Sequence, residues 1–271
     1  MTTAHGFDKW ETYNREHLEK CRGKYVAVTF SAGKDSSACL YFLTRAREKY
    51  GYDLGGFLYA FPRHRYTPEF RDTLLPFWKG LGVDILYRET EIEDTILENV
   101  ENPCRPCQNL RKKDLPEIFS LAGRPPEEVV IVSGHSLWDL AGYALDRFAA
   151  NELANGTDYS ESYSRDRFLE ISQRFYPFLS MKEGYSVYRP MLFLNVEEIS
   201  SVCEENSLPV LGTPCRYSEL RPKKVLGGYF RTFGYSFEYT QVLDFARKFL
   251  NIADLAEIQR MSQEEYLAHR F

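Results

Sequence analysis

The octapeptide Phe30-Ser31-Ala32-Gly33-Lys34-Asp35-Ser36-Ser37 joins a short apolar segment to a longer segment with helical periodicity. Residues 24–30 (KYVAVTF) are rich in β-branched and aromatic side chains, which predicts a buried strand. Residues 37–50 carry apolar side chains at helical spacing, which predicts a helix. A loop between a strand and a helix start directs backbone N–H groups and the positive end of the helix dipole to one point. The octapeptide, called the anion loop below, therefore predicts an anion-binding site.

The anion loop does not match the P-loop that hydrolyses a γ-phosphate, whose pattern is G-x-x-x-x-G-K-S/T. If Gly33 and Lys34 were its G-K pair, the first glycine would fall on Val28 and the magnesium-binding hydroxyl on Asp35. A ligand-free turn with an N-cap serine would explain Ser36, but not glycine, lysine and aspartate in the same turn. The pattern therefore favours a nucleotide site of another type.

The rest of the first half of the chain alternates between strand and helix patterns. Further strands are predicted at residues 54–61, 83–87 and 128–132, with a helix over 67–80. This alternation predicts a Rossmann-like parallel sheet with helices on both faces. In such sheets ligands bind beyond the carboxyl ends of the strands, which is where the anion loop lies. The backbone of Tyr59 and Ala60, at the end of the second strand, is a candidate adenine contact, and Gly134 and His135 follow the fourth strand.

The anion loop resembles the S-G-G-x-D-S signature of the PP-loop ATP pyrophosphatases. The resemblance implies an adenine nucleotide alpha hydrolase-like fold, and an enzyme that adenylates its substrate with ATP and releases pyrophosphate. It assigns Lys34 as a catalytic cation, Asp35 as a partner of Lys34 or of Mg²⁺, and Ser31, Gly33, Ser36 and Ser37 as the pyrophosphate cradle. Ala32 stands where the signature has its second glycine, and alanine can occupy such a position if its φ is below zero.

Composition describes an ordinary globular protein. The chain has 271 residues, 44% of them hydrophobic, and a net charge of −5, so it can bury a sizeable core and has no overall basic field for nucleic acid. No apolar run approaches the roughly 20 residues that a membrane helix needs, and the first residues are polar, so we expect no membrane partner and a cytoplasmic location.

The chain is predicted to divide into three parts. Residues 1–23 form an N-terminal helix, residues 24–216 form the PP-loop domain, and residues 217–271 form a helical C-terminal extension. Within the domain, residues 150–185 are polar at first and then aromatic, and are predicted to be an insertion or a lid.

Disulfides are not expected in the cytoplasm, so the six cysteines are candidates for buried thiols, metal ligands or catalytic groups. Five of them fall into two sets, and Cys21 stays unassigned. Cys39 and Cys203 lie among apolar residues and are predicted to be core thiols. Cys104 and Cys107 form a C-x-x-C pair beside prolines, and Cys215 lies in a second proline-containing loop. A C-x-x-C pair is typical of half a zinc site or of a redox pair, and three cysteines suit an iron-sulfur cluster with one open iron.

Taken in order, the motifs resemble those of the tRNA 2-thiolation enzymes, the 2-thiocytidine and 2-thiouridine synthetases. The order is the anion loop, C-x-x-C followed by basic residues (CQNLRKK), GHSLWD, RPMLFLNVEEI and a lone downstream cysteine. It spans roughly residues 24–216, and the absence of paired-cysteine zinc fingers places it nearer the 2-thiocytidine branch. The resemblance implies an ATP-dependent sulfurtransferase that adenylates a pyrimidine carbonyl, takes sulfur from a donor and acts as a homodimer.

The resemblance also assigns residues. Cys104, Cys107 and Cys215 would hold a 4Fe-4S cluster, and Asp139 would match the essential aspartate that follows G-H. Arg111, four residues past Cys107, would polarise the activated substrate. His135 is either a ligand or phosphate contact, or a histidine satisfied within its own turn.

Other functions stay open at this point. Thiolation of a small molecule or free base would keep the same chemistry, whereas an amide-forming PP-loop ligase would carry zinc at the cysteines. A nucleotide-binding regulator would have lost catalysis altogether. Basic residues interleaved with aromatic ones around Tyr229, Phe230 and Arg231 provide a candidate RNA surface or a solvated charged face.

Overall fold

The computed structural model describes residues 3–100, 102–113, 115–149, 172–220 and 222–259. Its centre is a six-stranded sheet in the order β3-β2-β1-β4-β6-β5. The strands are β1 (Tyr25–Thr29), β2 (Asp53–Tyr59), β3 (Asp84–Arg88), β4 (Val129–Ser133), β5 (Phe178–Ser180) and β6 (Ser186–Tyr188). All neighbours pair in parallel except β5, which runs antiparallel to β6 at the edge. The predicted α/β class with a parallel sheet is confirmed.

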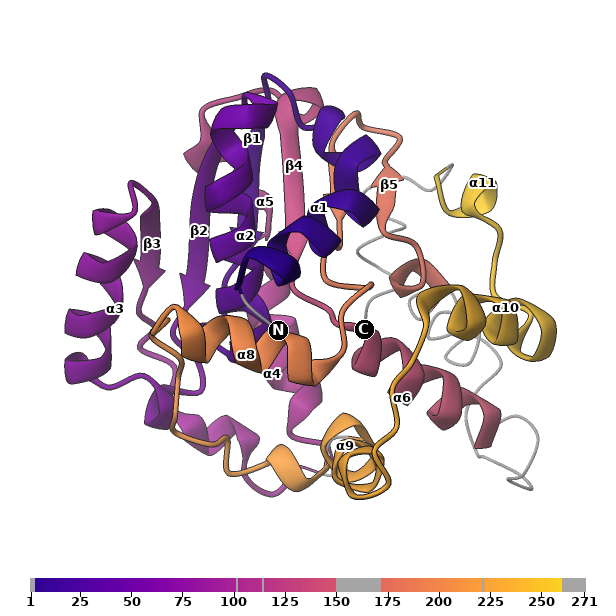
Figure 1. Cartoon of the computed structure of the whole chain (residues 1–271). Helices are drawn as coiled ribbons and strands as arrows, with labels where there is room; N and C mark the ends of the chain where they lie inside the picture. Colours follow the sequence, from indigo (N-terminus) through magenta and orange to yellow (C-terminus); the bar gives the residue numbers. More distant parts are fainter. Residues whose placement is uncertain (1–2, 101, 114, 150–171, 221, 260–271) are drawn as a thin grey trace.

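Helices cover both faces of this sheet (Figure 1). The principal helices are α1 (Thr3–Glu19), α2 (Lys34–Tyr50), α3 (Pro68–Gly80), α4 (Cys104–Lys113), α5 (Leu115–Ala122), α6 (Leu137–Phe148), α8 (Val196–Glu205), α9 (Pro222–Thr232), α10 (Tyr239–Leu250) and α11 (Leu255–Ile258). No helix in the described ranges is long and apolar enough to cross a membrane.

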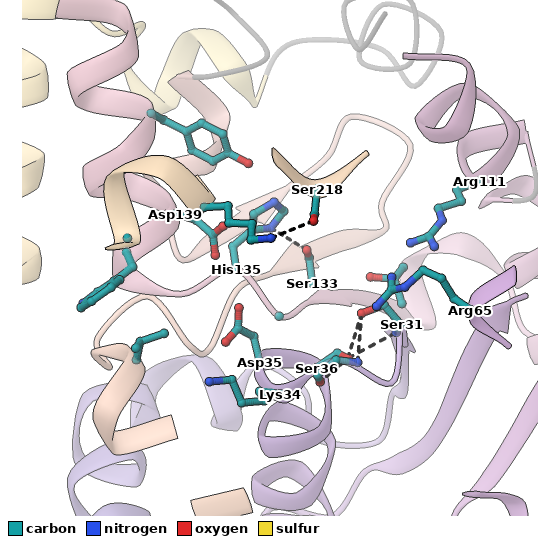
Figure 2. A pocket seen from close by; sticks show the side chains of 18 of the residues that line it. Ser31, Lys34, Asp35, Ser36, Arg65, Arg111, Ser133, His135, Asp139 and Ser218 are labelled. Atoms are coloured by element: carbon teal, nitrogen blue, oxygen red, sulfur yellow. Dashed lines mark hydrogen bonds between the residues drawn. The ribbon is translucent and has the colours of Figure 1, made fainter. Parts of the chain in front are cut away.

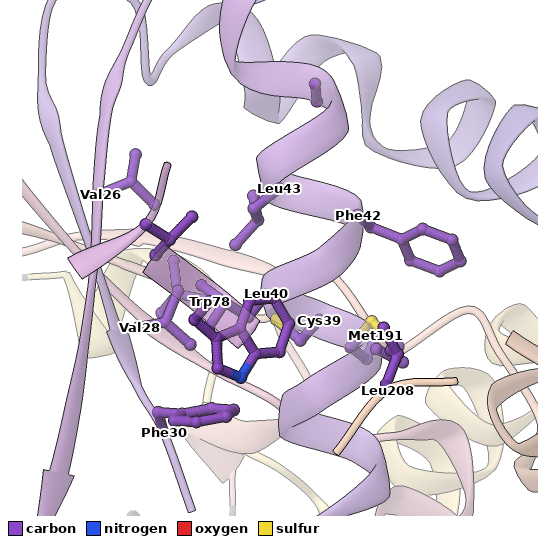
Figure 3. Close-up of a cluster of buried hydrophobic side chains, with 14 of the residues drawn as sticks. Val26, Val28, Phe30, Cys39, Leu40, Phe42, Leu43, Trp78, Met191 and Leu208 are labelled. Atoms are coloured by element: carbon purple, nitrogen blue, oxygen red, sulfur yellow. The ribbon is translucent and has the colours of Figure 1, made fainter. Parts of the chain in front are cut away.

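Alternation along the central strands separates two cores, because successive side chains of a strand point to opposite faces. Val26 and Val28 of β1 lie in the core beneath α1, α2, α3 and α8, while Ala27 lies in the core beneath α5, α6 and α10. Figure 3 shows the first core, where Leu40 and Leu43 of α2 and Trp78 of α3 pack against β1. The N-terminal helix and the helices after residue 217 therefore contribute to the two layers that cover the sheet.

The structure describes only part of the segment at residues 150–185, which was predicted to be an insertion or a lid. Residues 150–171 lie outside the described residues. Phe178–Ser180, by contrast, form β5 and hydrogen-bond to β6, so this end of the segment belongs to the sheet. The sequence did not predict it because a strand of three residues is too short to show a period.

The strand order reverses beside β1, which lies between β2 and β4. The loops that leave β1 and β4 consequently separate toward opposite sides and leave a crevice between them, the place where open α/β sheets bind ligands. In Figure 1 the carboxyl ends of the strands point toward α4, α8 and α9. The fold thus brings the anion loop, GHSLWD and α9 to one edge of the sheet.

Candidate functional site

The anion loop is closed by its own serines. The Ser36 hydroxyl accepts from the backbone N–H of Ser31 at 3.3 Å, lies 3.1 Å from the Ser31 hydroxyl and donates to the carbonyl of Gly33 at 3.0 Å. Helix α2 begins at Lys34, with Gly33 as its N-cap in an extended conformation. Because Gly33 provides no side-chain cap, the first N–H groups of α2 remain oriented for an anion.

The backbone conformation of Ala32 differs from the predicted one. Its φ is +54°, in the left-handed region, whereas alanine was expected here only with φ below zero. The residue is fully buried, and its carbonyl accepts from the backbone N–H of Leu211 at 2.7 Å. The loop therefore keeps the backbone shape that a glycine would adopt freely, and this costs an alanine about 1 kcal/mol.

The loop after β4 packs directly onto the anion loop. A Cβ on Gly134 would lie 3.0 Å from Cα and 3.1 Å from the backbone nitrogen of Ser36, so only glycine fits without a shift. His135 follows, and its Nδ1 lies 2.6 Å from the Ser133 hydroxyl. Gly134 thus sets the distance between the two loops, and His135 has a partner within its own turn.

Asp139 completes the start of α6. Its Oδ2 accepts from the backbone N–H of Ser136 at 2.8 Å and from the Ser136 hydroxyl at 3.0 Å, which makes a capping box. The S-x-x-D signature of this box is present in the sequence, although only the family resemblance pointed to Asp139. The box fixes the carboxylate at the cavity wall.

A cavity of about 580 Å³ lies between these loops. Figure 2 shows His135 and Asp139 on one side of the anion loop and Arg65 and Arg111 on the other. The lining side chains with positive charge come from four separate elements, α2, the turn at residues 63–65, α4 and α9, and are Lys34, Arg65, Arg111, Lys224 and Arg231. Such a cavity is large enough for a nucleotide and suits an anionic one.

Several lining residues were not predicted. Arg65 follows β2, Trp138 and Tyr143 lie on α6, and Ser218 precedes α9. Trp138 is held by Asn195, whose Oδ1 accepts from the indole N–H at 3.1 Å. No local pattern marks these residues as a group, since they come together only through packing; Asn195 alone had a signal, the N-x-x-E capping box at the start of α8.

Three of the residues predicted to bind the nucleotide do not line this cavity. The Ser37 hydroxyl is fully buried and donates to the carbonyl of Pro209 at 3.4 Å, and its backbone N–H donates to Gly33 at 2.9 Å. Tyr59 and Ala60 do not line the cavity, and the Ala60 N–H donates to the carbonyl of Arg88 at 2.8 Å. The Ser37 hydroxyl therefore contacts the core and not the cavity.

Arg111 reaches the cavity from α4. Its guanidinium donates to the carbonyl of Phe61 and to the Tyr66 hydroxyl, the latter at 3.3 Å. Its buried Nε has no hydrogen-bond partner among the residues that the structure describes. Burial lowers the pKa of Arg111, but Tyr66 and the thiols of Cys107 and Cys215 outweigh this, so the pKa is raised. A buried cation with an unpaired donor at a cavity wall is suited to an anionic ligand.

The core position predicted for Cys39 and Cys203 is confirmed, whereas Cys104 and Cys107, predicted to lie on a loop, form the start of helix α4. Cys39 and Cys203 are buried in the core, and burial raises the pKa of each thiol. Cys104 and Cys107 lie one turn apart at the start of α4. The thiols of Cys107 and Cys215 both contribute to raising the pKa of Arg111. Nevertheless, the described residues contain no group of three or more His, Cys, Asp or Glu arranged to hold a metal ion. The predicted three-cysteine site is thus not assembled in this structure.

Comparison with known proteins supports the fold. No protein-family profile and no curated protein sequence matches the chain. In structure it is similar to the U34-tRNA thiolase NcsA from Methanococcus maripaludis with its 4Fe-4S cluster, with a TM-score of 0.62 and 16% identity over 90% of this chain and 81% of that one. At this identity the similarity shows the PP-loop fold alone.

Two NAD synthetases are more weakly similar. The enzyme from Burkholderia pseudomallei gives a TM-score of 0.46 at 14% identity, over 99% of this chain and 86% of that one. The NH3-dependent enzyme from Campylobacter jejuni, in complex with nitrate, gives 0.45 at 13% identity, over 97% of this chain and 98% of that one.

Proposed function

We propose that the chain is an ATP-dependent enzyme that adenylates its substrate and releases pyrophosphate. The observation that carries this proposal is the anion loop at the reversal of strand order, facing a cavity of about 580 Å³ with positive side chains around it. The PP-loop fold and the mismatch with the hydrolytic P-loop support the same conclusion.

The phosphates and their Mg²⁺ are bound by groups at the start of α2 and by two carboxylates of the cavity. The first N–H groups of α2 bind the phosphates, and Lys34, whose Nζ donates to the Ser200 hydroxyl at 2.9 Å, lies at the same helix start. Among the described lining residues the carboxylates are Asp35 and Asp139. Mg²⁺ commonly uses one or two carboxylates together with substrate phosphates, so this pair fits an ion brought in with ATP.

The chemistry is adenylation followed by displacement. An acceptor oxygen attacks the α-phosphorus of ATP, the new P–O bond forms, and the bond to pyrophosphate breaks as pyrophosphate leaves with the electron pair. Negative charge on the phosphates is stabilised by fixed donors. Arg111, whose buried Nε has no partner within the described part of the chain, is the residue that we assign to the activated substrate.

We further propose that the displacing atom is sulfur, by analogy with the thiolase of the same fold. A sulfide-level donor attacks the carbon, a C–S bond forms, and the C–O bond breaks with AMP as the leaving group. This step needs neither an oxidant nor a reductant. A 4Fe-4S cluster or zinc at Cys104, Cys107 and Cys215 stays a prediction from the sequence pattern, and no step above passes through it.

A nucleic-acid acceptor has a specific observation in its favour. Val225, Tyr229, Phe233 and Tyr235, on and just after α9, are exposed by 64%, 52%, 60% and 45%, and the rings of Tyr229 and Phe233 lie 4.7 Å apart. The other side of α9 contributes Arg231 to the cavity. Exposed rings beside a basic residue are typical of surfaces that stack unpaired bases, which favours tRNA over a small acceptor.

Product analysis tests adenylation. Incubated with ATP, Mg²⁺ and unfractionated tRNA, the full chain should release AMP and pyrophosphate, and Lys34→Ala should reduce the release strongly. Release of ADP and phosphate instead would contradict the proposal, and no release with tRNA or with free pyrimidines would favour a regulator. A strain lacking the gene should lose a thionucleoside from its tRNA; unchanged thionucleosides would exclude tRNA as the acceptor.

Metal analysis tests the cysteine prediction separately. After anaerobic purification, iron and acid-labile sulfide would support a cluster, and their loss in Cys107→Ser would assign it to the pair. Zinc without labile sulfide would favour the amide-forming ligase.

A further inference from the structure

A short 3-10 turn, η1 (Arg63–Arg65), is hydrogen-bonded to the loop that contains Cys215. The Nε of Arg65 donates to the carbonyl of Thr213 at 3.1 Å, and the Nε2 of His64 accepts from the backbone N–H of Arg216 at 3.3 Å. Two consecutive residues thus hold the two sides of residues 213–216, called the cysteine loop below. Cys215 lies between the two contacts and is 7% exposed.

The ring of His64 is in turn held by Asp94. Its Nδ1 lies 2.6 Å from Oδ2 of Asp94, and the same carboxylate accepts the backbone N–H groups of Arg63 at 2.7 Å and His64 at 3.0 Å. The side chains of His64 and Asp94 are only 10% and 17% exposed. With the Nδ1 proton donated to Asp94, the lone pair of Nε2 faces the Arg216 N–H, so the two contacts require the same tautomer.

Arg65 has a second role, since its side chain also lines the cavity. Figure 2 shows it beside Ser31, on the same side as Arg111. One guanidinium therefore contacts the cysteine loop through Nε and reaches the proposed phosphate site. A guanidinium can do both because its donors point in several fixed directions, whereas an ammonium cannot.

We infer that His64 and Arg65 are positioning residues that couple occupancy of the cavity to the position of Cys215. An anion bound in the cavity orders the guanidinium of Arg65, and Arg65 transmits this order to Thr213. His64, fixed by Asp94, holds the opposite side of the cysteine loop at Arg216. A shift of Thr213 therefore changes the position of Cys215, which lies between the two contacts. The inference rests on the proposed nucleotide site.

Alkylation of Cys215 by iodoacetamide, followed by peptide mass spectrometry on the metal-free full chain, measures this coupling. The non-cleavable analogue α,β-methylene-ATP should slow the reaction of Cys215 about fivefold, the factor that corresponds to one ordinary hydrogen bond. Arg65→Lys should abolish the response to the analogue. The analogue's own affinity is measured by calorimetry in each variant.

Two substitutions at His64 separate its two contacts. Asn keeps a donor near the Nδ1 position but loses the contact with Arg216, so His64→Asn should speed Cys215 alkylation about fivefold without nucleotide. Gln places an acceptor near the Nε2 position, so His64→Gln should restore most of the protection. A merely structural role for His64 would not distinguish the two variants in this direction.

The buried thiols of Cys39 and Cys203 report folding in the same digest and should stay protected. If they react in His64→Asn, Asp94→Asn replaces it and should raise the Cys215 rate from a second position. Unchanged Cys215 rates in the folded variants would overturn the inference, as would analogue binding without any change at Cys215. Failure of the analogue to bind would instead refute the nucleotide site, while the His64 comparison would still test the hold on the loop.

Discussion

Gly134 lies against Ser36 so closely that a methyl group on Gly134 would come within 3.0 Å of the Ser36 Cα. This contact joins the loop after β4 to the first turn of α2, the two sides of the crevice where the strand order reverses. Because backbone meets backbone, neither side can give way as a flexible side chain could. The spacing of the two loops therefore depends on the absence of a Cβ at Gly134.

Gly134→Ala should separate the two loops. We expect a loss of about 2 kcal/mol in the free energy of unfolding, in the range of core overpacking, together with weaker ATP binding. Gly228→Ala is the matched control, because a Cβ there meets nothing within 4 Å in α9 and should stabilise the helix by up to about 1 kcal/mol. Urea denaturation and ATP titration measure both effects. Normal ATP affinity in Gly134→Ala would show that the contact does not shape the site.

Ser36 and Ser37 should differ sharply when each is replaced by alanine. Ser36→Ala removes the hydroxyl that closes the anion loop and should weaken ATP binding about tenfold. Ser37→Ala removes a buried donor to Pro209 and should lower the free energy of unfolding by about 1 kcal/mol, with ATP affinity unchanged. Isothermal titration of each variant decides between them. Equal losses of affinity would place Ser37 in the phosphate cradle.

Ala32 should tolerate glycine and reject a β-branched residue. Glycine relieves the strain at φ +54° but gives up a buried methyl group and gains unfolded-state freedom, so Ala32→Gly should be nearly neutral. Ala32→Val should lose about 2 kcal/mol, since a β-branched residue is a true outlier in the left-handed region. Denaturation of the two variants checks the order. Equal stability of valine and glycine would mean that the loop does not hold this conformation.

His17 should make stability fall in mild acid. Its ring is stacked on Phe178 with centroids 5.5 Å apart, and burial, together with the charge of Lys20, lowers its pKa to about 4. The unfolded chain binds this proton near pH 6.5, so the stabilising contribution is complete above that pH and is lost as pH falls toward 4. The loss amounts to about 3 kcal/mol.

His17→Phe is the matched control for this pH effect, because it keeps a ring beside Phe178 and cannot take up a proton. Glu11 also titrates toward the acid end of this range, because burial raises its pKa less than hydrogen bonds from Lys49 and Tyr50 lower it. The measurement is consequently the difference in unfolding free energy between wild type and variant at pH 7 and at pH 4. A difference that does not change with pH would contradict the prediction.

Much of the architecture was legible in the sequence. The strands β1 to β4 lie within two residues of the predicted segments, because their apolar runs are short and bounded by polar turns. The edge strand β5 was missed, since Phe178–Ser180 is too short to show a period. The anion loop was placed correctly after β1, as its position follows from the order of strand, glycine and helix.

The remaining features depend on contacts between distant segments. Arg65, Trp138 and Tyr143 join the cavity although no spacing connects them, and the contact of His64 with Arg216 spans 152 residues. The sequence could place Ser36 and Ser37 in one loop but not decide which faces the cavity. That choice follows from the phase of α2, whose buried side lies against β1.

By itself the sequence determined the parallel α/β fold, the anion loop at the end of β1 and the core position of Cys39 and Cys203, because each depends on local order and on period. Only the tertiary structure decided the left-handed conformation of Ala32, the place of Gly134 against Ser36 and the hold of η1 on the cysteine loop. The physical reason is that backbone strain and the meeting of loops arise from packing between layers, which no local pattern encodes.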